Sequence, residues 1–123
     1  MNEIGPSFGI PEDESAKEQA VIVSIKLSND GFGSEVEEAS LAELEAEIGD
    51  CLRDSEAGDW EGHETGGGYH KIFLYGPDAD VLSETVLPTV MKFEARSGSY
   101  LVKRFGEVGS DEQYIWLDSE VRA

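Results

Sequence analysis

The stretch Gly62 to Asp80 reads GHETGGGYHKIFLYGPDAD and carries the strongest fold signals in the chain. Glycine pairs between two runs with β propensity are typical of a hairpin, because a two-residue turn needs positive φ angles. We predict a turn at Gly66-Gly67 that joins an edge strand, residues 59–65, to a second strand, residues 69–75. A three-residue turn would shift every cross-strand pair by one. The expected pairs are His63 with His70, Glu64 with Tyr69, and Trp60 with Phe73.

The end of the same stretch predicts the start of a helix. Gly76-Pro77 breaks the strand, Asp78 suits the N-cap, and Asp80 adds favourable negative charge to the first turn. We therefore assign helix capping to the two aspartates, rather than an acid/base pair or a cation site. Pro88 lies inside the predicted helix, so a kink or a break with a restart is expected there.

Upstream and downstream segments complete the fold prediction. Residues 20–28 alternate as a strand, with Val21, Val23, Ile25 and Leu27 toward the core. A capping box at Ser40 and Glu43 predicts a helix to about residue 56, and residues 99–105 and 113–118 read as strands. The order βαββαβ plus one strand predicts an α+β, ferredoxin-like fold: an antiparallel sheet with both helices on one face. In that arrangement the first and third strands are central and the second lies at an edge.

Composition indicates one globular domain. The 123 residues are enough for a single core, which we place at 19–123 behind a flexible acidic tail, residues 1–18. No apolar run is long enough to span a membrane, and MNEIGPSFGIPEDES lacks the basic-then-apolar order of a signal peptide. The single cysteine, Cys51, forms no internal disulfide, so we expect a cytoplasmic protein.

Charge is the most informative feature for function. The chain has 27 acids and 9 bases, a net charge of −18, and residues 35–64 hold twelve acids and one base, Arg53. Such a field repels nucleic acid and anionic membranes and attracts basic proteins. General acidification for salt or solubility is the alternative, although it would spread the acids more evenly. The residues that we expect to meet a basic partner are Glu43, Glu45, Glu47, Asp50, Asp54, Glu56, Asp59 and Glu61.

Several catalytic chemistries lack support in the pattern. A phosphate-binding loop precedes a helix N-terminus, whereas these glycines lie between two strands. Cys51 lies on the apolar stripe of the first helix, where a small buried hydrophobe is the simpler interpretation. Both histidines lie on the hairpin, so no Ser/His/Asp constellation can be assigned. We therefore expect a non-enzymatic protein with no cofactor.

The hairpin histidines leave one alternative open. Facing histidines on paired strands bring their Cβ atoms to about 5 Å, close enough to share a metal ion. Glu61, two residues before His63, would be the third ligand of a metal-dependent enzyme. A solvated polar pair without metal is the simpler interpretation of His63 and His70.

The sheet face away from the helices is predicted to be aromatic. If Ile72 and Leu74 point toward the helices, the other face carries a candidate ligand surface with Lys26 nearby. Aromatic faces on this fold stack RNA bases, but the negative charge opposes that reading. We expect the final strand or a second subunit to cover the face, since an uncovered patch is prone to association. The predicted face consists of Trp60, Tyr69, Phe73 and Tyr75.

Two resemblances complete the sequence evidence. The segments GHETGGGYHKIFLYGPDAD and GSYLVKRFG resemble those of a family of small, uncharacterised bacterial proteins, over about residues 59–106. That resemblance implies the hairpin–helix–strand order and no activity. In general character the chain also resembles immunity proteins that neutralise bacterial toxins. The leading functional prediction is an acidic immunity or inhibitor protein that masks a basic partner such as a nuclease toxin; the alternative is a housekeeping or ligand-binding homodimer.

Overall fold

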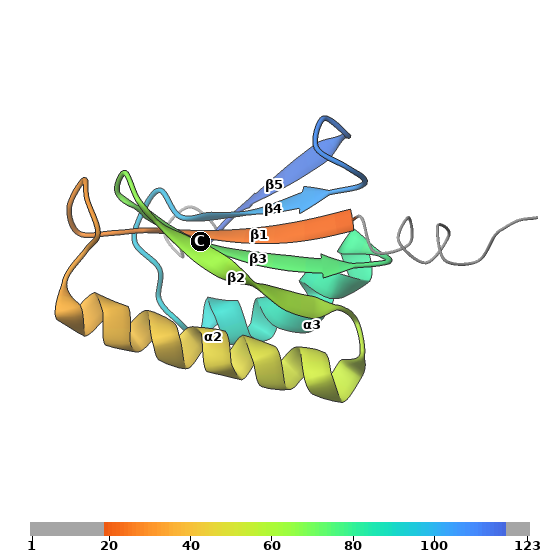
Figure 1. Cartoon of the computed structure of the whole chain (residues 1–123), viewed down its shortest axis with the longest axis horizontal. Coiled ribbons are helices and arrows are strands. Elements are labelled where there is room, and N and C mark those ends of the chain that lie inside the picture. Colours follow the sequence, from red (N-terminus) through yellow and green to blue (C-terminus); the bar gives the residue numbers. More distant parts are fainter. Residues whose placement is uncertain (1–18, 118–123) are drawn as a thin grey trace, which may run out of the picture.

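The computed structural model describes residues 19–117 as an α+β fold with one five-stranded antiparallel sheet. The sheet order is β2-β3-β1-β4-β5, which puts β1 between β3 and β4. Both helices cover the same face of the sheet (Figure 1). The predicted tail, residues 1–18, lies outside the described residues, and no described helix has the length and apolarity needed to cross a membrane. The elements are β1 (Gln19–Lys26), α2 (Glu35–Ser55), β2 (Asp59–Gly66), β3 (Tyr69–Gly76), α3 (Ala79–Met91), β4 (Tyr100–Arg104) and β5 (Glu112–Trp116).

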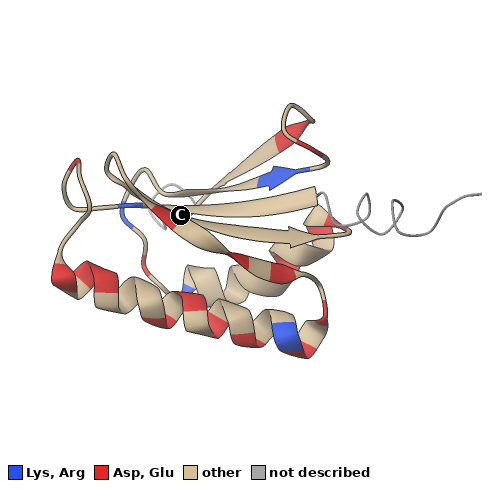
Figure 2. Ribbon diagram, viewed as in Figure 1, with Lys and Arg blue, Asp and Glu red and all other residues tan. Residues whose placement is uncertain are grey.

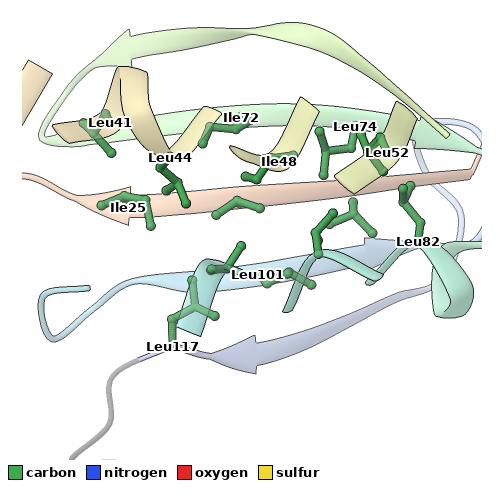
Figure 3. Close-up of a cluster of buried hydrophobic side chains, with 14 of the residues drawn as sticks. Ile25, Leu41, Leu44, Ile48, Leu52, Ile72, Leu74, Leu82, Leu101 and Leu117 are labelled. Atoms are coloured by element: carbon green, nitrogen blue, oxygen red, sulfur yellow. The ribbon is translucent and has the colours of Figure 1, made fainter. Parts of the chain in front are cut away.

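The hydrophobic core fills the layer between the sheet and the two helices (Figure 3). The predicted alternation of β1 is confirmed, because the side chains at its odd positions are buried against the helices. The helical stripe of α2 supplies the opposite wall through Leu41, Leu44, Ile48 and Leu52. The core therefore fixes which face of α2 points inward, and with it the direction of every acidic side chain on that helix.

Helix α2 begins earlier than the sequence predicted. Its N-cap is Ser34, not Ser40, and the capping box pairs Ser34 with Glu37. The Ser34 hydroxyl accepts from the Glu37 amide at 3.2 Å, and the Ser34 amide donates to the Glu37 carboxylate at 2.9 Å. Both serines have capping-box spacing, so the sequence pattern alone does not separate them.

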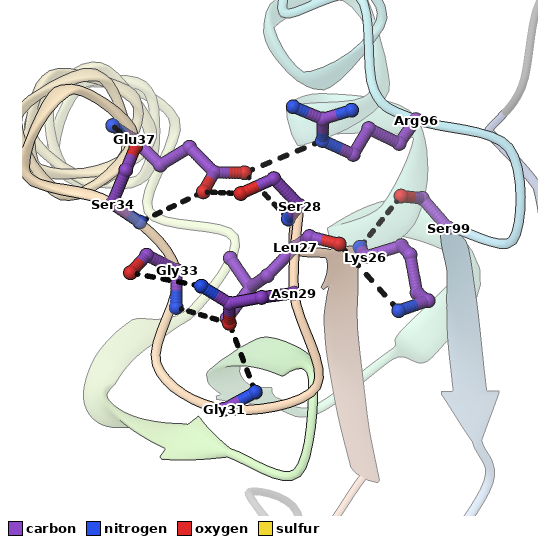
Figure 4. A network of polar contacts seen from close by, with 10 residues as sticks. All are labelled: Lys26, Leu27, Ser28, Asn29, Gly31, Gly33, Ser34, Glu37, Arg96 and Ser99. Carbon is purple, nitrogen blue, oxygen red and sulfur yellow. Dashed lines mark hydrogen bonds and ion pairs between the residues drawn. The ribbon is translucent and has the colours of Figure 1, made fainter.

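Contacts with distant segments favour the earlier box (Figure 4). The Ser28 amide and hydroxyl donate to the Glu37 carboxylate at 2.9 and 2.7 Å, and Arg96 Nε donates at 3.3 Å. These bonds stabilise the charged form of Glu37. They lower the pKa of Glu37 from 4.5 to about 2. The hydrogen bond from the Ser28 hydroxyl contributes most, backbone amides and Arg96 contribute less, and partial burial opposes the shift.

We expect Glu37→Gln to lower the free energy of unfolding by about 1–2 kcal/mol at pH 7, through loss of an anionic acceptor and a cap. Because the folded pKa is depressed, the stabilisation is complete above about pH 4.5 and disappears as pH falls toward 2. Urea denaturation at pH 7, 4 and 3 measures both effects. Glu38→Gln, in the same helical turn, is the matched control, and equal acid dependence in the two variants would contradict the account.

The cross-strand pairs of the hairpin differ from the predicted pairs, because the two-residue turn lies one residue later in the chain. The turn lies at Gly67-Gly68, so Thr65 pairs with His70 and His63 pairs with Ile72. Hydrogen bonds at Gly68 favour this position of the turn. The Leu27 amide donates to the Gly68 carbonyl at 2.8 Å, and the Gly68 amide donates to the Gly31 carbonyl at 3.0 Å. Contacts from the loop after β1 therefore select the turn.

The second helix confirms one prediction and corrects another. The Asp78 carboxylate caps α3 by accepting from the amides of Asp80 and Val81, at 2.9 and 3.3 Å. A kink or a break with a restart was predicted at Pro88, and the break is wrong, because α3 continues through Pro88 to Met91. Burial of Val86 and Val90 on either side holds the helix in place despite the missing N–H of the proline.

Candidate functional site

Four acids form one outward-facing row on α2. Glu43, Glu47, Asp50 and Asp54 follow one another by four, three and four residues, which places them on the same side of a helix. All four are exposed, whereas Leu44 and Ile48 on the same helix are buried. We call these four residues the acidic stripe.

Little positive charge offsets the acidic stripe. Arg53, the one base in residues 35–64, makes an ion pair with Asp50. Figure 2 shows acids along α2 and on β2, whereas basic residues gather on β4 and near the connection from α3 to β4. Glu56, Asp59 and Glu61 are exposed at the end of α2 and on β2, as the predicted partner surface requires. Acids are therefore concentrated on α2 and β2, where Arg53 is the one base.

Glu45 differs from the other predicted partner residues. Its side chain is only 10% exposed and lies under the β2–β3 hairpin. Its Oε1 accepts from Trp60 Nε1 at 2.9 Å and lies 2.9 Å from His63 Nδ1, while its Oε2 lies 2.7 Å from His70 Nε2. Glu45 therefore joins α2 to both strands of the hairpin and is not presented to a partner.

An irregularity in β2 brings these groups together. The pairing shifts between Trp60 and His63, where Trp60 pairs with Leu74 and His63 pairs with Ile72. One extra residue on β2 lets two side chains three apart face the same side of the sheet, which regular alternation would forbid. Gly62, at φ 110°, lies within this bulge. A glycine inside a strand is the sequence signal that would have predicted it.

The bulge corrects the predicted position of Trp60. Its indole reaches Glu45 on the helix side of the sheet, so Trp60 does not belong to the open aromatic face. His63 and His70 are diagonal neighbours in the regular register after the bulge, and their ring centroids lie 4.7 Å apart although the two residues are not directly paired. Glu61, the predicted third ligand, is exposed on β2, and Glu45 stands in its place.

The cluster has the composition of a metal-binding site. One ligand atom from each of Glu45, His63 and His70 lies within 4.8 Å of the others. The His70 side chain is 7% exposed, and its Nδ1 lies 2.8 Å from the Thr65 hydroxyl. The His63 side chain, at 48% exposed, lies on the solvent side of the cluster.

The face of the sheet away from the helices is aromatic, and no element within residues 19–117 covers it. Of the two covers that we predicted, the final strand is wrong, because β5 pairs with β4 and extends the sheet instead. Tyr69 and Tyr100 form an edge contact with centroids 6.0 Å apart, and Lys26 Nζ lies 5.5 Å from the Tyr69 centroid, as predicted. The rings that β4 and β5 add to the predicted Tyr69, Phe73 and Tyr75 are Tyr100, Tyr114 and Trp116.

A shallow hollow lies in this aromatic face. It has a volume of about 330 Å³ and is lined by Ser24, Phe73, Tyr100 and Tyr114 among others. The Ser24 hydroxyl is buried there and has no hydrogen-bond partner among the described residues. At the rim, the hydrogen bond that Tyr114 donates to Glu112 raises the Tyr114 pKa, so this phenol stays protonated.

A larger cleft separates α2 from the end of α3. It has a volume of about 610 Å³, an apolar floor that includes Ile25 and Leu27, and a rim of both charges. Glu43 and Glu47 of the acidic stripe line one side, and Lys92 and Arg96 belong to the other. Nearby, Cys51 is half-buried with its Sγ 3.2 Å from the Thr89 hydroxyl, a packing position between the helices.

Comparison of the chain with protein-family models, curated proteins and solved structures finds no match. The functional argument therefore stands on the sites themselves: the acidic stripe, the Glu45–His63–His70 cluster and the aromatic sheet face.

Proposed function

We propose that the chain is a non-enzymatic binding protein whose acidic surface recognises a basic protein. The surface comprises the acidic stripe with Glu56, Asp59 and Glu61. The observation that supports it is the exposed row of four acids on α2, a helix whose one base, Arg53, is itself ion-paired. Electrostatic attraction on this scale speeds encounter with a lysine- and arginine-rich partner.

Helix stability does not account for the acidic stripe. Like charges four residues apart destabilise a helix by about 0.2–0.5 kcal/mol per pair, and the stripe holds two such pairs, Glu43 with Glu47 and Asp50 with Asp54. Asp54 also lies in the last turn of α2, where the helix dipole disfavours negative charge. An arrangement that opposes folding is better explained by binding.

The mechanism that we propose is masking. A rigid helix presents carboxylates to the surface that the partner uses for its own anionic ligand, such as nucleic acid, and blocks it by charge and bulk. This is the action expected of an immunity or inhibitor protein against a nuclease toxin. The fold that supports the surface is, in our proposal, a ferredoxin-like βαββαβ unit followed by the extra edge strand β5.

Capture of the partner tests the proposal. The tagged full chain is incubated with lysate of the source organism at low and at high salt. We expect one stoichiometric basic protein at low salt and its loss at high salt, because exposed charges are screened beyond about 8 Å at physiological ionic strength. Absence of a stoichiometric basic partner at both salt concentrations would contradict the proposal.

The aromatic sheet face favours a second candidate function, as a homodimer or small-ligand domain. The supporting observation is the buried, unpartnered Ser24 hydroxyl in a hollow lined by aromatic rings. Ligand pockets combine aromatic walls with a few polar groups of this kind. If the face joins two copies, sedimentation should show a dimer that Trp116→Ser and Tyr114→Ser together abolish. A monomer at all concentrations would exclude the dimer.

A further inference from the structure

We propose that Glu45, His63 and His70 bind one zinc ion between α2 and the β2–β3 hairpin. Two imidazole nitrogens and a carboxylate are a donor set that zinc accepts, usually with a fourth position left to water. The proposal does not depend on the acidic partner surface, because Glu45 is covered by the hairpin whereas the acidic stripe is exposed.

The observed distances are close to those that zinc requires. Zinc–ligand bonds of about 2.0–2.1 Å in a tetrahedron separate the ligand atoms by about 3.3 Å. The Glu45 oxygens lie 2.9 Å from His63 Nδ1 and 2.7 Å from His70 Nε2, and all three ligand atoms lie within 4.8 Å. Small outward shifts of the carboxylate and an inward shift of His63 would complete the site.

The surroundings of His70 suit both the metal-free and the zinc-bound state. Without metal, the neutral tautomer that fits these contacts carries its hydrogen on Nε2, which then donates to Glu45 while Nδ1 accepts from the Thr65 hydroxyl. When zinc takes Nε2, the ring carries its hydrogen on Nδ1 and donates to the same hydroxyl, which also accepts hydrogen bonds. No net proton is lost from the ring, and the buried nitrogen keeps a partner throughout.

His63 is the ligand on the solvent side of the cluster and the one whose position can adjust to zinc. It lies on an edge strand next to the bulge glycine Gly62, and its side chain is half-exposed. The solvent side of the cluster therefore leaves room for a water or an external ligand at the fourth zinc position. Because the three residues come from α2, β2 and β3, bound zinc would fasten the edge strand to the helix.

Zinc titration of the chelator-stripped, full-length chain tests the site. The titration uses competition with a chromogenic zinc chelator and excess Mg²⁺, which occupies weak sites on the acidic surface. We expect saturation at one equivalent and a thermal midpoint several degrees higher with zinc. Binding without saturation, or with an unchanged midpoint, would overturn the proposal.

Four variants locate the bound zinc. His63→Ala should weaken zinc binding by about 100-fold or more, and Thr65→Val by about 10-fold through loss of the His70 hydrogen bond. Glu64→Gln, the adjacent acid on the open face, and Cys51→Ser should bind as the wild type does. His63 is used because its exposure favours a folded variant, checked by circular dichroism. Equal zinc affinity in His63→Ala and Glu64→Gln would overturn the assignment.

Discussion

Reversing four charges on the proposed surface should slow association with the basic partner by about 10- to 100-fold at low salt. The variant combines Glu43→Lys, Glu47→Lys and Asp54→Lys on α2 with Glu61→Lys on β2. All four side chains are exposed, and lysine has nearly the helix propensity of glutamate, so the fold should persist. Asp50 and Glu45 are left unchanged because they pair with Arg53 and with the hairpin.

Stopped-flow association over a series of salt concentrations measures the effect. The control variant reverses four exposed acids elsewhere, Glu84, Glu107, Asp111 and Glu112, and has the same net charge. We expect it to slow association much less, and the α2 variant to lose most of the salt dependence. If both variants associate equally slowly, net charge rather than the acidic surface governs encounter.

Glu45→Ala should lower the free energy of unfolding by about 3 kcal/mol. Glu45 accepts from Trp60 and faces both histidines, so its removal leaves the buried His70 Nε2 without its partner. An orphaned buried donor costs about 1–3 kcal/mol, and hydrogen bonds to charged groups are worth more than neutral ones. Coupled contacts of this kind are not additive, which keeps the expected total below the sum of three bonds.

Urea denaturation with a chelator present measures this effect without any contribution from metal. Glu47→Ala is the matched control, since it removes an exposed acid from the same helix, and should change stability by no more than about 0.5 kcal/mol. Amide exchange should also quicken across β2 in Glu45→Ala alone. Equal stability of the two variants would show that the hairpin is not held by Glu45.

Features that depend on local pattern were predicted well. The alternation of β1, the apolar stripe of α2 and the Asp78 cap each follow from residues that are neighbours in sequence. The capping box of α2 was misplaced because Ser34-x-x-Glu37 and Ser40-x-x-Glu43 satisfy the same local rule. Ser28 and Arg96, remote in sequence, add the bonds that distinguish them.

The candidate sites required the tertiary structure. The pattern placed Glu45 among the exposed acids, because a helix alone does not reveal that a hairpin will cover its flank. Regular alternation would put Trp60 and His63 on opposite faces of the sheet, and the bulge at Gly62 puts them on the same face. The sequence did not place Tyr100 and Trp116 on the aromatic face. Their rings meet there because β5 pairs with β4, and that pairing is a tertiary feature.

A side-by-side capture experiment tests the central claim most directly. Three forms of the chain are each used at low salt to retain the partner. They are the wild type, the four-reversal α2 variant, and a sheet-face variant that combines Tyr114→Ser with Trp116→Ser. The account predicts that wild type and the sheet-face variant retain the same basic protein at one-to-one stoichiometry, and that the α2 variant does not. Retention by the α2 variant together with loss by the sheet-face variant would contradict it and place the interaction on the aromatic face.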